Sequence, residues 1–275
     1  MNEGSLSPFL KWPGGKRWLL KKNPELFSVK FNNYYEPFLG SGAVFFYLCP
    51  KKAVLSDVNE ELINLYIQMR DYPQLLIEQL ESHQKKHGKE YYYEIRDKSY
   101  SSSIERAGRF LYLNRTCFNG MYRENREGKF NVPIGTKNNC TYDIYNFEYY
   151  SNALKSAELI ACDFREVISK TQKGDLLFVD PPYTIGQTQQ NRFIKYNSKL
   201  FSWNDQKDLW SEIIRARDRG TIVISTNAYC DELLEMYKNE GFYVQTIEKK
   251  STISGVVDKR RKTTELLITS FFLPH

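Results

Sequence analysis

Short apolar runs recur along the chain and predict the strands of a buried sheet. The clearest is 176–179 (LLFV), and similar runs occupy 53–57 and 221–225. An uninterrupted apolar run of this length is typical of a parallel strand that is covered on both faces. Weaker strand patterns open the segment 34–48 and lie near 159–162, 242–248 and 264–272.

Helical periodicity alternates with these runs. Apolar side chains recur at helical spacing within 60–82, 90–113, 205–219 and 231–240. This alternation predicts an α/β fold built on a doubly wound mixed sheet. In the middle of the chain, however, helical patterns follow one another without strands. We therefore expect one α/β domain formed by 1–61 and 146–275, with a mostly helical insertion at 62–145.

The last part of the insertion, 114–145, is rich in Asn, Gly and Arg and has no regular pattern. A polar stretch of this length inside a compact protein is usually either functional or disordered. Its aromatic side chains and the segment 130–133 (FNVP) favour order.

Composition narrows the functional classes only modestly. The chain of 275 residues has a net charge of +6, which permits a polyanionic partner without requiring one. Five scattered cysteines include no pair at metal-ligand spacing, so neither a disulfide framework nor a metal site is expected. His83 and His87 lack the Glu of a zinc-protease motif and are expected to be exposed. No segment resembles a signal peptide or a membrane span, so a cytoplasmic protein is expected.

Candidate chemistry is concentrated in Asp180-Pro181-Pro182-Tyr183, directly after the run 176–179. Open α/β sheets bind their ligands at this edge. Asp180 could accept a hydrogen bond from an exocyclic amine, the rigid prolines could direct the Pro181 carbonyl at the second N–H, and Tyr183 offers a stacking face. A strand followed by a simple turn, with Tyr183 packed on the surface, would also explain the motif.

A second candidate site is the segment 36–42 (EPFLGSG), whose glycines allow close approach of the backbone to a ligand. Phe45 stands where a dinucleotide fingerprint has its third small residue, so Gly40 and Gly42 alone could be turn glycines. Asp57 ends the next expected strand, where a carboxylate can bind both hydroxyls of a ribose or cap a helix.

A P-loop is not indicated at Gly15-Lys16. Arg17 replaces the required Ser or Thr, and Leu10 stands where the first glycine belongs. A glycine turn, a ribose-binding carboxylate and an acidic motif that faces an amine fit S-adenosylmethionine better than ATP.

Together these strings resemble Dam-type (D12 class) DNA adenine-N6 methyltransferases over nearly the whole chain. The resemblance rests on 9–16 (FLKWPGGK), 36–42 (EPFLGSG), 110–115 (FLYLNR), 118–123 (FNGMYR), 130–133 (FNVP), 180–183 (DPPY) and 261–267 (RKTTELL). It implies that Asp180, Pro181, Pro182 and Tyr183 are catalytic, that 1–61 and 146–275 bind S-adenosylmethionine, and that 62–145 recognises DNA.

The resemblance also implies two sets of binding residues. The cofactor would be bound by Trp12, Lys16, Glu36, Phe38, Gly40, Gly42, Asp57, Asp163, Phe164 and Asp180. Asp163 would bind the amino group of the cofactor's adenine, although a helix N-cap and a core ring would equally explain Asp163-Phe164. DNA would be contacted by Lys11, Arg115, Asn119, Met121, Arg123, Pro133, Lys137, Arg260, Arg261 and Lys262.

Within the DNA set, Lys11 and Arg123 would reach base edges, and Met121 and Pro133 would touch bases through apolar contacts. The basic run 259–262 would neutralise phosphates. Without the family, a phosphate contact or a solvated surface charge is the simpler interpretation of any single Lys or Arg here.

The implied reaction transfers a methyl group to adenine N6 after the base has been flipped out of the duplex. Tyr183 would stack on the flipped base, while Asp180 and the Pro181 carbonyl would stabilise the positive charge that grows on its amino group. No covalent intermediate is expected, because the chain lacks the Pro-Cys pair of cytosine-C5 enzymes.

Several alternatives stay open at this point. Cytosine-N4 methylation uses the same chemistry, although Asp180 and the motif order favour adenine. Enzymes that act on RNA or on protein glutamine usually carry Asn at the position of Asp180. A catalytically silent DNA-binding relative would not be expected to retain Asp180, Tyr183, Gly40 and Asp57 together.

The expected recognition site is a short duplex sequence with a GA core, either GATC or a longer site that begins GAT. Gly135-Thr136-Lys137 replaces the Gly-Arg-Tyr of GATC readers, and 115–121 (RTCFNGM) is at least as similar to restriction-system enzymes. We expect a bacterial or phage-encoded, nucleoid-associated monomer that binds double-stranded DNA and, in a restriction system, has a cognate endonuclease.

Overall fold

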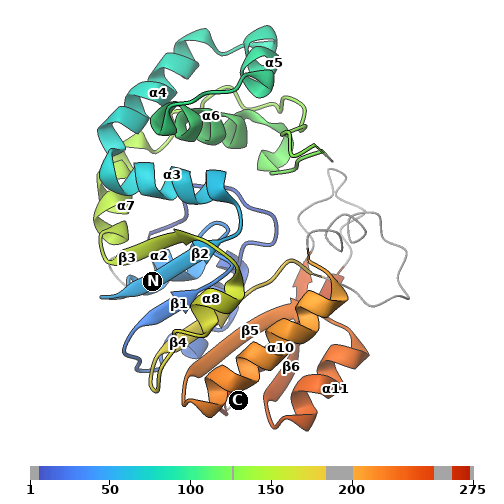
Figure 1. Ribbon diagram of the computed structural model, residues 1–275. Helices are drawn as coiled ribbons and strands as arrows, with labels where there is room; N and C mark the ends of the chain where they lie inside the picture. Colours follow the sequence, from blue (N-terminus) through green and yellow to red (C-terminus); the bar gives the residue numbers. More distant parts are fainter. Residues whose placement is uncertain (1–5, 126, 184–200, 251–261, 273–275) are drawn as a thin grey trace. The chain divides into compact units, whose positions relative to one another are not determined.

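The computed structural model describes residues 6–125, 127–183, 201–250 and 262–272. The chain divides into two compact units, drawn together in Figure 1. Unit 1 consists of 1–22, 39–51 and 57–161, and unit 2 consists of 23–38, 52–56 and 162–275. The predicted insertion, 62–145, falls wholly within unit 1.

Seven strands form one sheet in the described part of the chain, in the order β3-β2-β1-β4-β5-β7-β6. Their bounds are β1 Tyr34–Glu36, β2 Ala53–Asp57, β3 Ala157–Ala161, β4 Leu176–Val179, β5 Ile222–Ala228, β6 Tyr243–Lys250 and β7 Lys262–Thr269. β1 pairs in parallel with β2 and β4, and β4 pairs in parallel with β5. β7 runs antiparallel to both β5 and β6, so the predicted mixed α/β sheet is confirmed.

The order of the parallel strands reverses beside β1, which lies between β2 and β4. Such a switch point is where open α/β sheets bind ligands, outside the carboxyl ends of the strands. All four residues of β4 are buried, as its apolar sequence predicts, and Asp180 follows immediately. The acidic motif therefore begins at the carboxyl edge of the sheet, next to the switch point.

Unit 2 packs three helices against its strands: α8 (Phe164–Ile168), α10 (Trp203–Asp218) and α11 (Asp231–Asn239). In Figure 1 these helices lie along the strands of the orange and yellow part of the chain. Leu209 and Ile213 of α10 and Leu233 of α11 share a buried cluster with Leu177 and Val223 of the sheet. Burial of each such side chain contributes about 1.5–3 kcal/mol, which fixes the strands that carry the motif.

Unit 1 contains most of the remaining helices. They are α1 Arg17–Lys22, α2 Ala43–Leu48, α3 Glu60–Asp71, α4 Pro73–Lys86, α5 Lys89–Asp97, α6 Ser103–Thr116 and α7 Phe147–Leu154. Short 3-10 turns occur at η1 Pro24–Phe27 in unit 2 and at η2 Phe118–Gly120 and η3 Ile144–Asn146 in unit 1. α6 packs against both α3 and α4, and α7 packs against the same two helices.

The helical periodicity over 60–82 is divided between α3 and α4. Pro73 is the first residue of α4, and Tyr72 before it has φ −137° and ψ 51°. Proline cannot donate the N–H that a continuous helix would need, and it disfavours the helical conformation of the preceding residue. The prediction of helix was right, but the break at Tyr72 was not foreseen.

An aromatic cluster anchors the N-terminal segment within unit 1. The ring of Phe9 lies edge-on to Phe46 and Tyr66, at centroid distances of 5.9 and 5.3 Å, and tilted against Tyr150 at 5.2 Å. The Tyr150 hydroxyl also donates to the carbonyl of Ser7. Aromatic pairs in this arrangement stabilise beyond simple burial, so the segment that contains Lys11 and Trp12 is firmly held.

The polar stretch after α6 is ordered, as its sequence predicted. Cys117 and Glu124 form antiparallel bridges with Ile134 and Phe130 respectively, which makes 117–134 a hairpin-like loop. At its tip the side chain of Asn125 accepts hydrogen bonds from the backbone of Glu127 and Lys129. We call 117–134, described apart from residue 126, the recognition hairpin below, after the DNA contacts that the sequence predicts for it.

The expectation that His83 and His87 are exposed was wrong. His83 is 5% exposed and stacks on Tyr112 at a centroid distance of 4.7 Å, with a 2.8 Å hydrogen bond between its Nδ1 and the Tyr91 hydroxyl. His87 is half-buried and hydrogen-bonds Tyr112. Both histidines face the tyrosine-rich surface between α4, α5 and α6, a packing that helical spacing alone did not reveal.

Burial lowers the pKa of His83 from 6.5 to about 4, with further contributions from Lys86 and Lys98. The unfolded chain therefore binds this proton more tightly than the folded chain. The contribution of His83 to the free energy of unfolding is therefore fully present above pH 6.5 and is lost as the pH drops towards 4.

We expect His83→Phe, which keeps a ring against Tyr112, to remove this pH dependence. The wild-type free energy of unfolding should contain a component that falls by roughly 1.4 kcal/mol per pH unit in that window. Urea unfolding of both proteins across this pH range measures the difference, and parallel pH profiles would contradict the prediction.

None of the helices that the structure describes is both long and apolar enough to cross a bilayer.

Candidate functional site

The acidic motif at the end of β4 is held by hydrogen bonds from neighbouring strands of unit 2. The Oγ1 hydroxyl of Thr226 donates to Oδ1 of Asp180 over 2.8 Å. Thr226 lies in β5 and is 1% exposed, whereas Asp180 is half-buried. Pro181 is buried and Pro182 is partly buried. The Asp180 carboxylate is therefore partly exposed, and one of its oxygens accepts a hydrogen bond from a buried donor.

The ring of Tyr183 is positioned by the next strand of the sheet. Its hydroxyl donates to Oε2 of Glu265 in β7 over 2.7 Å, and Glu265 is 4% exposed. Burial raises the pKa of Tyr183 well above its usual value, and the negative charges of Asp180 and Glu265 raise it further. The phenol therefore stays protonated at neutral pH and keeps donating to Glu265.

Strand register explains why these residues meet. Val179 is the partner of Ser225 in the parallel β4–β5 pair, so the residues that follow them, Asp180 and Thr226, are adjacent. In the antiparallel β5–β7 pair, Glu265 lies opposite Ala228, two residues after Thr226. Residues two apart in a strand share a face, so Thr226 and Glu265 lie on the same side of the sheet.

The glycine turn and Asp57 form a second polar group, within unit 1. Asp57 accepts hydrogen bonds from the backbone N–H groups of Gly40 and Asn59, each over 3.1 Å. Burial raises the pKa of Asp57, although these hydrogen bonds act in the opposite direction. The N-cap of α3 is Asn59, which accepts from Leu62 N–H, so the alternative interpretation of Asp57 as a helix N-cap does not hold.

Gly40 is required at this turn. Its φ is +47°, and a Cβ would lie 2.7 Å from Cδ1 of Trp12. Trp12 itself stacks on Tyr122, at a centroid distance of 5.0 Å, and on Phe110. The backbone at position 40 can therefore pass close to the indole only because Gly40 has no side chain. Gly42 is the N-cap of α2 with φ 63°.

Lys16 and Glu36, both implied to contact the cofactor, are buried polar residues. Lys16 is 3% exposed and donates from Nζ to the carbonyl of Gly14 over 2.8 Å. Glu36 accepts a 2.8 Å hydrogen bond from the hydroxyl of Tyr34. Each therefore has an internal partner that stabilises its burial.

Three phenylalanines cluster at the start of α8 in unit 2. Phe38 stacks on Phe164 at 5.5 Å and meets the ring of Phe201 edge-on at 5.7 Å. Phe164 is buried, and the guanidinium of Arg165 lies 4.4 Å from its ring centroid. Asp163 is the N-cap of α8, accepting from the backbone N–H of Arg165. Asp163 thus caps the helix and Phe164 is a core ring, which is the alternative interpretation that the sequence left open for this pair.

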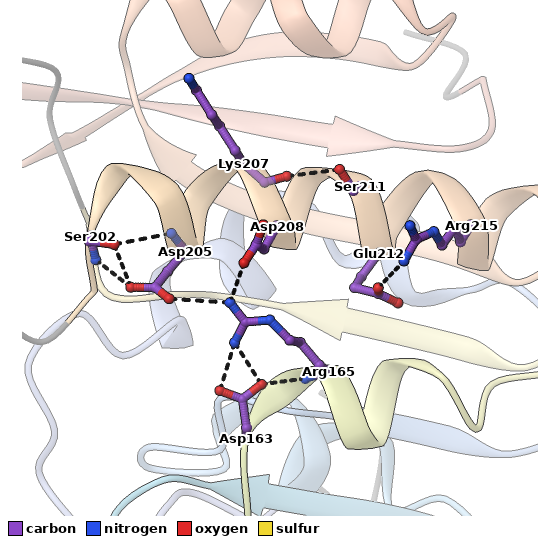
Figure 2. Close-up of polar contacts among 9 residues, drawn as sticks. All are labelled: Asp163, Arg165, Ser202, Asp205, Lys207, Asp208, Ser211, Glu212 and Arg215. Carbon is purple, nitrogen blue, oxygen red and sulfur yellow. Dashed lines mark hydrogen bonds and ion pairs between the residues drawn. The ribbon is translucent and has the colours of Figure 1, made fainter.

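Arg165 connects this cap to α10. Figure 2 shows its guanidinium between Asp163 and two carboxylates of α10. It contacts Asp163 at 2.9 Å, Asp205 at 3.2 Å and Asp208 at 2.6 Å. Asp205 also forms the capping box of α10 with Ser202. One cation thus fixes the start of both helices and the position of the Asp163 carboxylate.

Lys11 is held in unit 1 by Asn114 of α6. The Lys11 N–H donates to Oδ1 of Asn114, and Nδ2 of Asn114 donates to the Lys11 carbonyl over 2.7 Å. A Cβ at Gly120 would overlap the Lys11 side chain, which therefore lies across the recognition hairpin. Partial burial lowers the pKa of Lys11, and the neighbouring Lys137 lowers it further. Lys11 and Lys137 are thus brought together.

Other residues implied to contact DNA lie on the recognition hairpin. Arg123 is exposed and donates from Nε to Oδ1 of Asn131 over 2.8 Å. Asn119 and Pro133 are exposed, and Met121 is partly exposed. Asn119 has φ 56°, a conformation that Asn tolerates better than most residues. These side chains can all be reached from solvent.

Arg115 does not join them. It is fully buried, and its Nη1 donates to the carbonyls of Cys140 and Tyr142. Its Nη2 forms an ion pair with Asp143 at 2.8 Å. The interpretation of Arg115 as a DNA contact is therefore corrected: its guanidinium holds the segment 140–143 against α6.

The remaining predicted DNA contacts cannot be placed. Arg260 and Arg261 lie outside the described residues, and Lys262 is the first residue of β7, with no description of its side chain. In the part of the chain that the structure describes, no three His, Cys, Asp or Glu side chains could together hold a metal ion.

Several residues of the site were assigned no role from the sequence: Thr226, Glu265, Arg165, Asn114 and Asn131. Asn114, Asn131 and Glu265 stood in the strings that carried the resemblance, but no role was assigned to them. Thr226 had a usable signal, since it lies near the carboxyl end of the strand that follows the Asp180 strand. Arg165 had none, because its partners on α10 are distant in sequence.

Comparison with known proteins gives consistent matches over most of the chain. Residues 12–253 match the family described as D12 class N6 adenine-specific DNA methyltransferase. The chain is 38% identical to the Type II methyltransferase M1.LlaDCHI of Lactococcus lactis subsp. cremoris, over 98% of this chain and 97% of that protein. It is 33% identical to the Type II methyltransferase M.MjaIII of Methanocaldococcus jannaschii, over 97% and 99%. It is 31% identical to a DNA adenine methylase of Vibrio cholerae serotype O1, over 97% and 96%.

The corrected role of Arg115 can be tested by stability. We expect Arg115→Met to lower the free energy of unfolding by about 3–5 kcal/mol, because it leaves Asp143 and two carbonyls without their buried cation. Arg123→Met, at an exposed arginine of the same unit, should change it by about 0.5 kcal/mol or less. Urea unfolding at neutral pH measures both, and equal effects would refute the assignment.

Proposed function

Because the chain belongs to the D12 class N6 adenine-specific DNA methyltransferase family, we propose how it performs adenine methylation. It transfers a methyl group from S-adenosylmethionine to adenine N6 in a short duplex site with a GA core, after flipping the base. The observation that carries this proposal is the partly exposed Asp180 carboxylate at the end of β4, held by Thr226 and followed by Pro181, Pro182 and Tyr183.

The motif acts on the amino group of the target adenine. The lone pair of that nitrogen is delocalised into the ring, so the amine is a weak nucleophile. Its two N–H groups donate hydrogen bonds to Asp180 and to the Pro181 carbonyl. These bonds favour a pyramidal nitrogen with a localised lone pair. Positive charge grows on the nitrogen as it is alkylated, and the same preorganised acceptors stabilise that charge.

Tyr183 supplies a stacking surface for the flipped base. Extrusion of a base costs a few kcal/mol, and stacking in the pocket offsets part of this cost. The 2.7 Å hydrogen bond to Glu265 fixes the ring before the base arrives. A ring that is already ordered loses little entropy on stacking, which makes the contact more favourable.

The described residues fit the chemistry of S-adenosylmethionine, which supplies an electrophilic methyl group on a sulfonium. In unit 1, Asp57 lies against the Gly40 turn and can accept from both hydroxyls of a ribose. In unit 2, Phe38 and Phe164 offer an aromatic surface, and the neighbouring Asp163 carboxylate can accept from an adenine amino group. Trp12, Lys16, Glu36 and Gly42 complete the proposed set.

Recognition of the duplex is assigned to the insertion, 62–145, and to Lys11. Arg123 on the recognition hairpin can bind guanine O6 and N7 with two hydrogen bonds. Lys11 and Lys137 concentrate positive charge at one place, which favours phosphate or guanine acceptors. Met121 and Pro133 can contact bases through apolar groups. The proposed site is GATC or a longer GAT-type sequence.

We further propose that the enzyme acts as a monomer, one strand at a time, inside a bacterial or phage-infected cell. The Type II designation of two of its relatives favours a cognate restriction endonuclease as its functional counterpart.

We expect Asp180→Ala to lower the rate of methyl transfer by about 100- to 1,000-fold or more, because the preorganised acceptor is lost. Liquid chromatography of nucleosides from treated DNA measures N6-methyladenine directly. Asp218→Ala, at an exposed carboxylate of α10, serves as the control and should be fully active. A folded Asp180→Ala protein with near-normal turnover would refute the proposed role.

Arg123→Ala should weaken binding to the cognate duplex by about 1–3 kcal/mol while leaving non-specific binding nearly unchanged. The reason is that a base contact adds affinity only where its base is present. Lys129→Ala, at an exposed lysine of the same hairpin, is the matched control. Fluorescence anisotropy at fixed salt compares the variants, and an equal loss on all sequences would make Arg123 a phosphate contact.

A further inference from the structure

The buried hydroxyl of Thr226 donates to the carboxylate on which the proposed reaction depends. It lies 2.8 Å from Oδ1 of Asp180. The last torsion of an aspartate side chain is broad and has no strong intrinsic preference, so the carboxylate needs an external contact to fix its plane. The directed hydrogen bond from Thr226 to Oδ1 contributes to that constraint.

Thr226 is itself rigid. It is β-branched, lies in the buried strand β5 and is 1% exposed, so its own torsion is restricted. The residue after it, Asn227, donates to Gln206 of α10 over 3.0 Å, and Gln206 is fully buried. The Asn227 side chain also accepts from the Ala228 N–H. The carboxyl end of β5 is therefore held in place from both the sheet and α10.

We infer that Thr226 is a positioning residue for methyl transfer, which orients the Asp180 carboxylate towards the target amine. This inference rests on the proposed role of Asp180. An ionised carboxylate can accept about four hydrogen bonds, and the bond from Thr226 occupies one of these positions. The orientation is supplied by the protein before DNA binds, which is the condition for effective electrostatic catalysis.

The hydroxyl also affects the charge of the carboxylate. A donated hydrogen bond favours the ionised form, which is the form that accepts from an amine. Two further titratable groups lie at the motif: the Tyr183 phenol, from the segment after β4, and the Glu265 carboxylate, from β7, which are hydrogen-bonded to each other. The Tyr183 phenol also interacts with the Thr226 hydroxyl and with the charge of Asp180.

The experiment compares Thr226→Val, which removes the hydroxyl with little change in shape, with Thr226→Ser, which keeps it. Single-turnover methylation should be slower by about 10- to 100-fold in the Val variant, because small errors in alignment are costly. The Ser variant should stay within about threefold of wild type on the same argument. Dissociation constants for DNA and for S-adenosylmethionine should be nearly unchanged in both.

Thr221→Val is the matched control. Thr221 is also buried, precedes the opposite end of β5, and bonds Thr171 and Gln172 through its hydroxyl. Loss of the Thr221 hydroxyl should lower thermal stability without slowing methyl transfer.

The acid limb of the pH–rate profile should move to higher pH in Thr226→Val alone, since a carboxylate without its donor protonates more readily. Thr226→Ala provides a second hydroxyl-free variant if the Val side chain prevents folding.

The outcomes separate this inference from the proposed function. A Thr226→Val enzyme with the wild-type rate and pH profile would overturn the inference, as would equal impairment of the Val and Ser variants. A wild-type protein that binds S-adenosylmethionine and DNA but methylates nothing would overturn the proposed function instead.

Discussion

The parallel pairing of β4 with β5 is the constraint on which the proposed catalytic site depends. It places Val179 opposite Ser225, so Asp180, directly after β4, and Thr226, within β5, are neighbours. A shift of one residue in this register would turn Thr226 to the other face of the sheet and remove the donor from the carboxylate. The apolar side chains that bury β4 and β5 therefore stabilise the fold and align the proposed catalytic carboxylate at the same time.

Elsewhere the structure uses arginines to connect segments that are distant in the sequence. Arg115 holds 140–143 through two carbonyls and Asp143, and Arg165 joins the starts of α8 and α10 through three carboxylates. Arg115 is fully buried, so its removal would leave unpaired partners behind, whereas the ion pairs of Arg165 are partly exposed and contribute less to stability. Each arginine thus stabilises the local structure beside a proposed binding surface, although neither needs to touch a ligand.

The sequence was sufficient for the sheet, for most helices and for the acidic motif, because long apolar runs and a rare tetrapeptide are local signals. It was insufficient where the outcome depended on tertiary contacts. Arg115 stands in a segment rich in polar residues, yet it is buried by Asp143 and Tyr142 from a distant loop. His83 has helical neighbours that suggest a solvated face, but α5 and α6 cover it with tyrosines. The Thr226–Asp180 contact required strand register, which periodicity does not specify.

The central claim is that this site methylates adenine N6 at a short sequence with a GA core. Single-molecule sequencing of DNA from a methylation-free host that expresses the protein tests it most directly. We predict N6-methyladenine at one GA-containing motif and at no other position. Modified cytosine, or no modified base from a folded protein that binds S-adenosylmethionine, would contradict it.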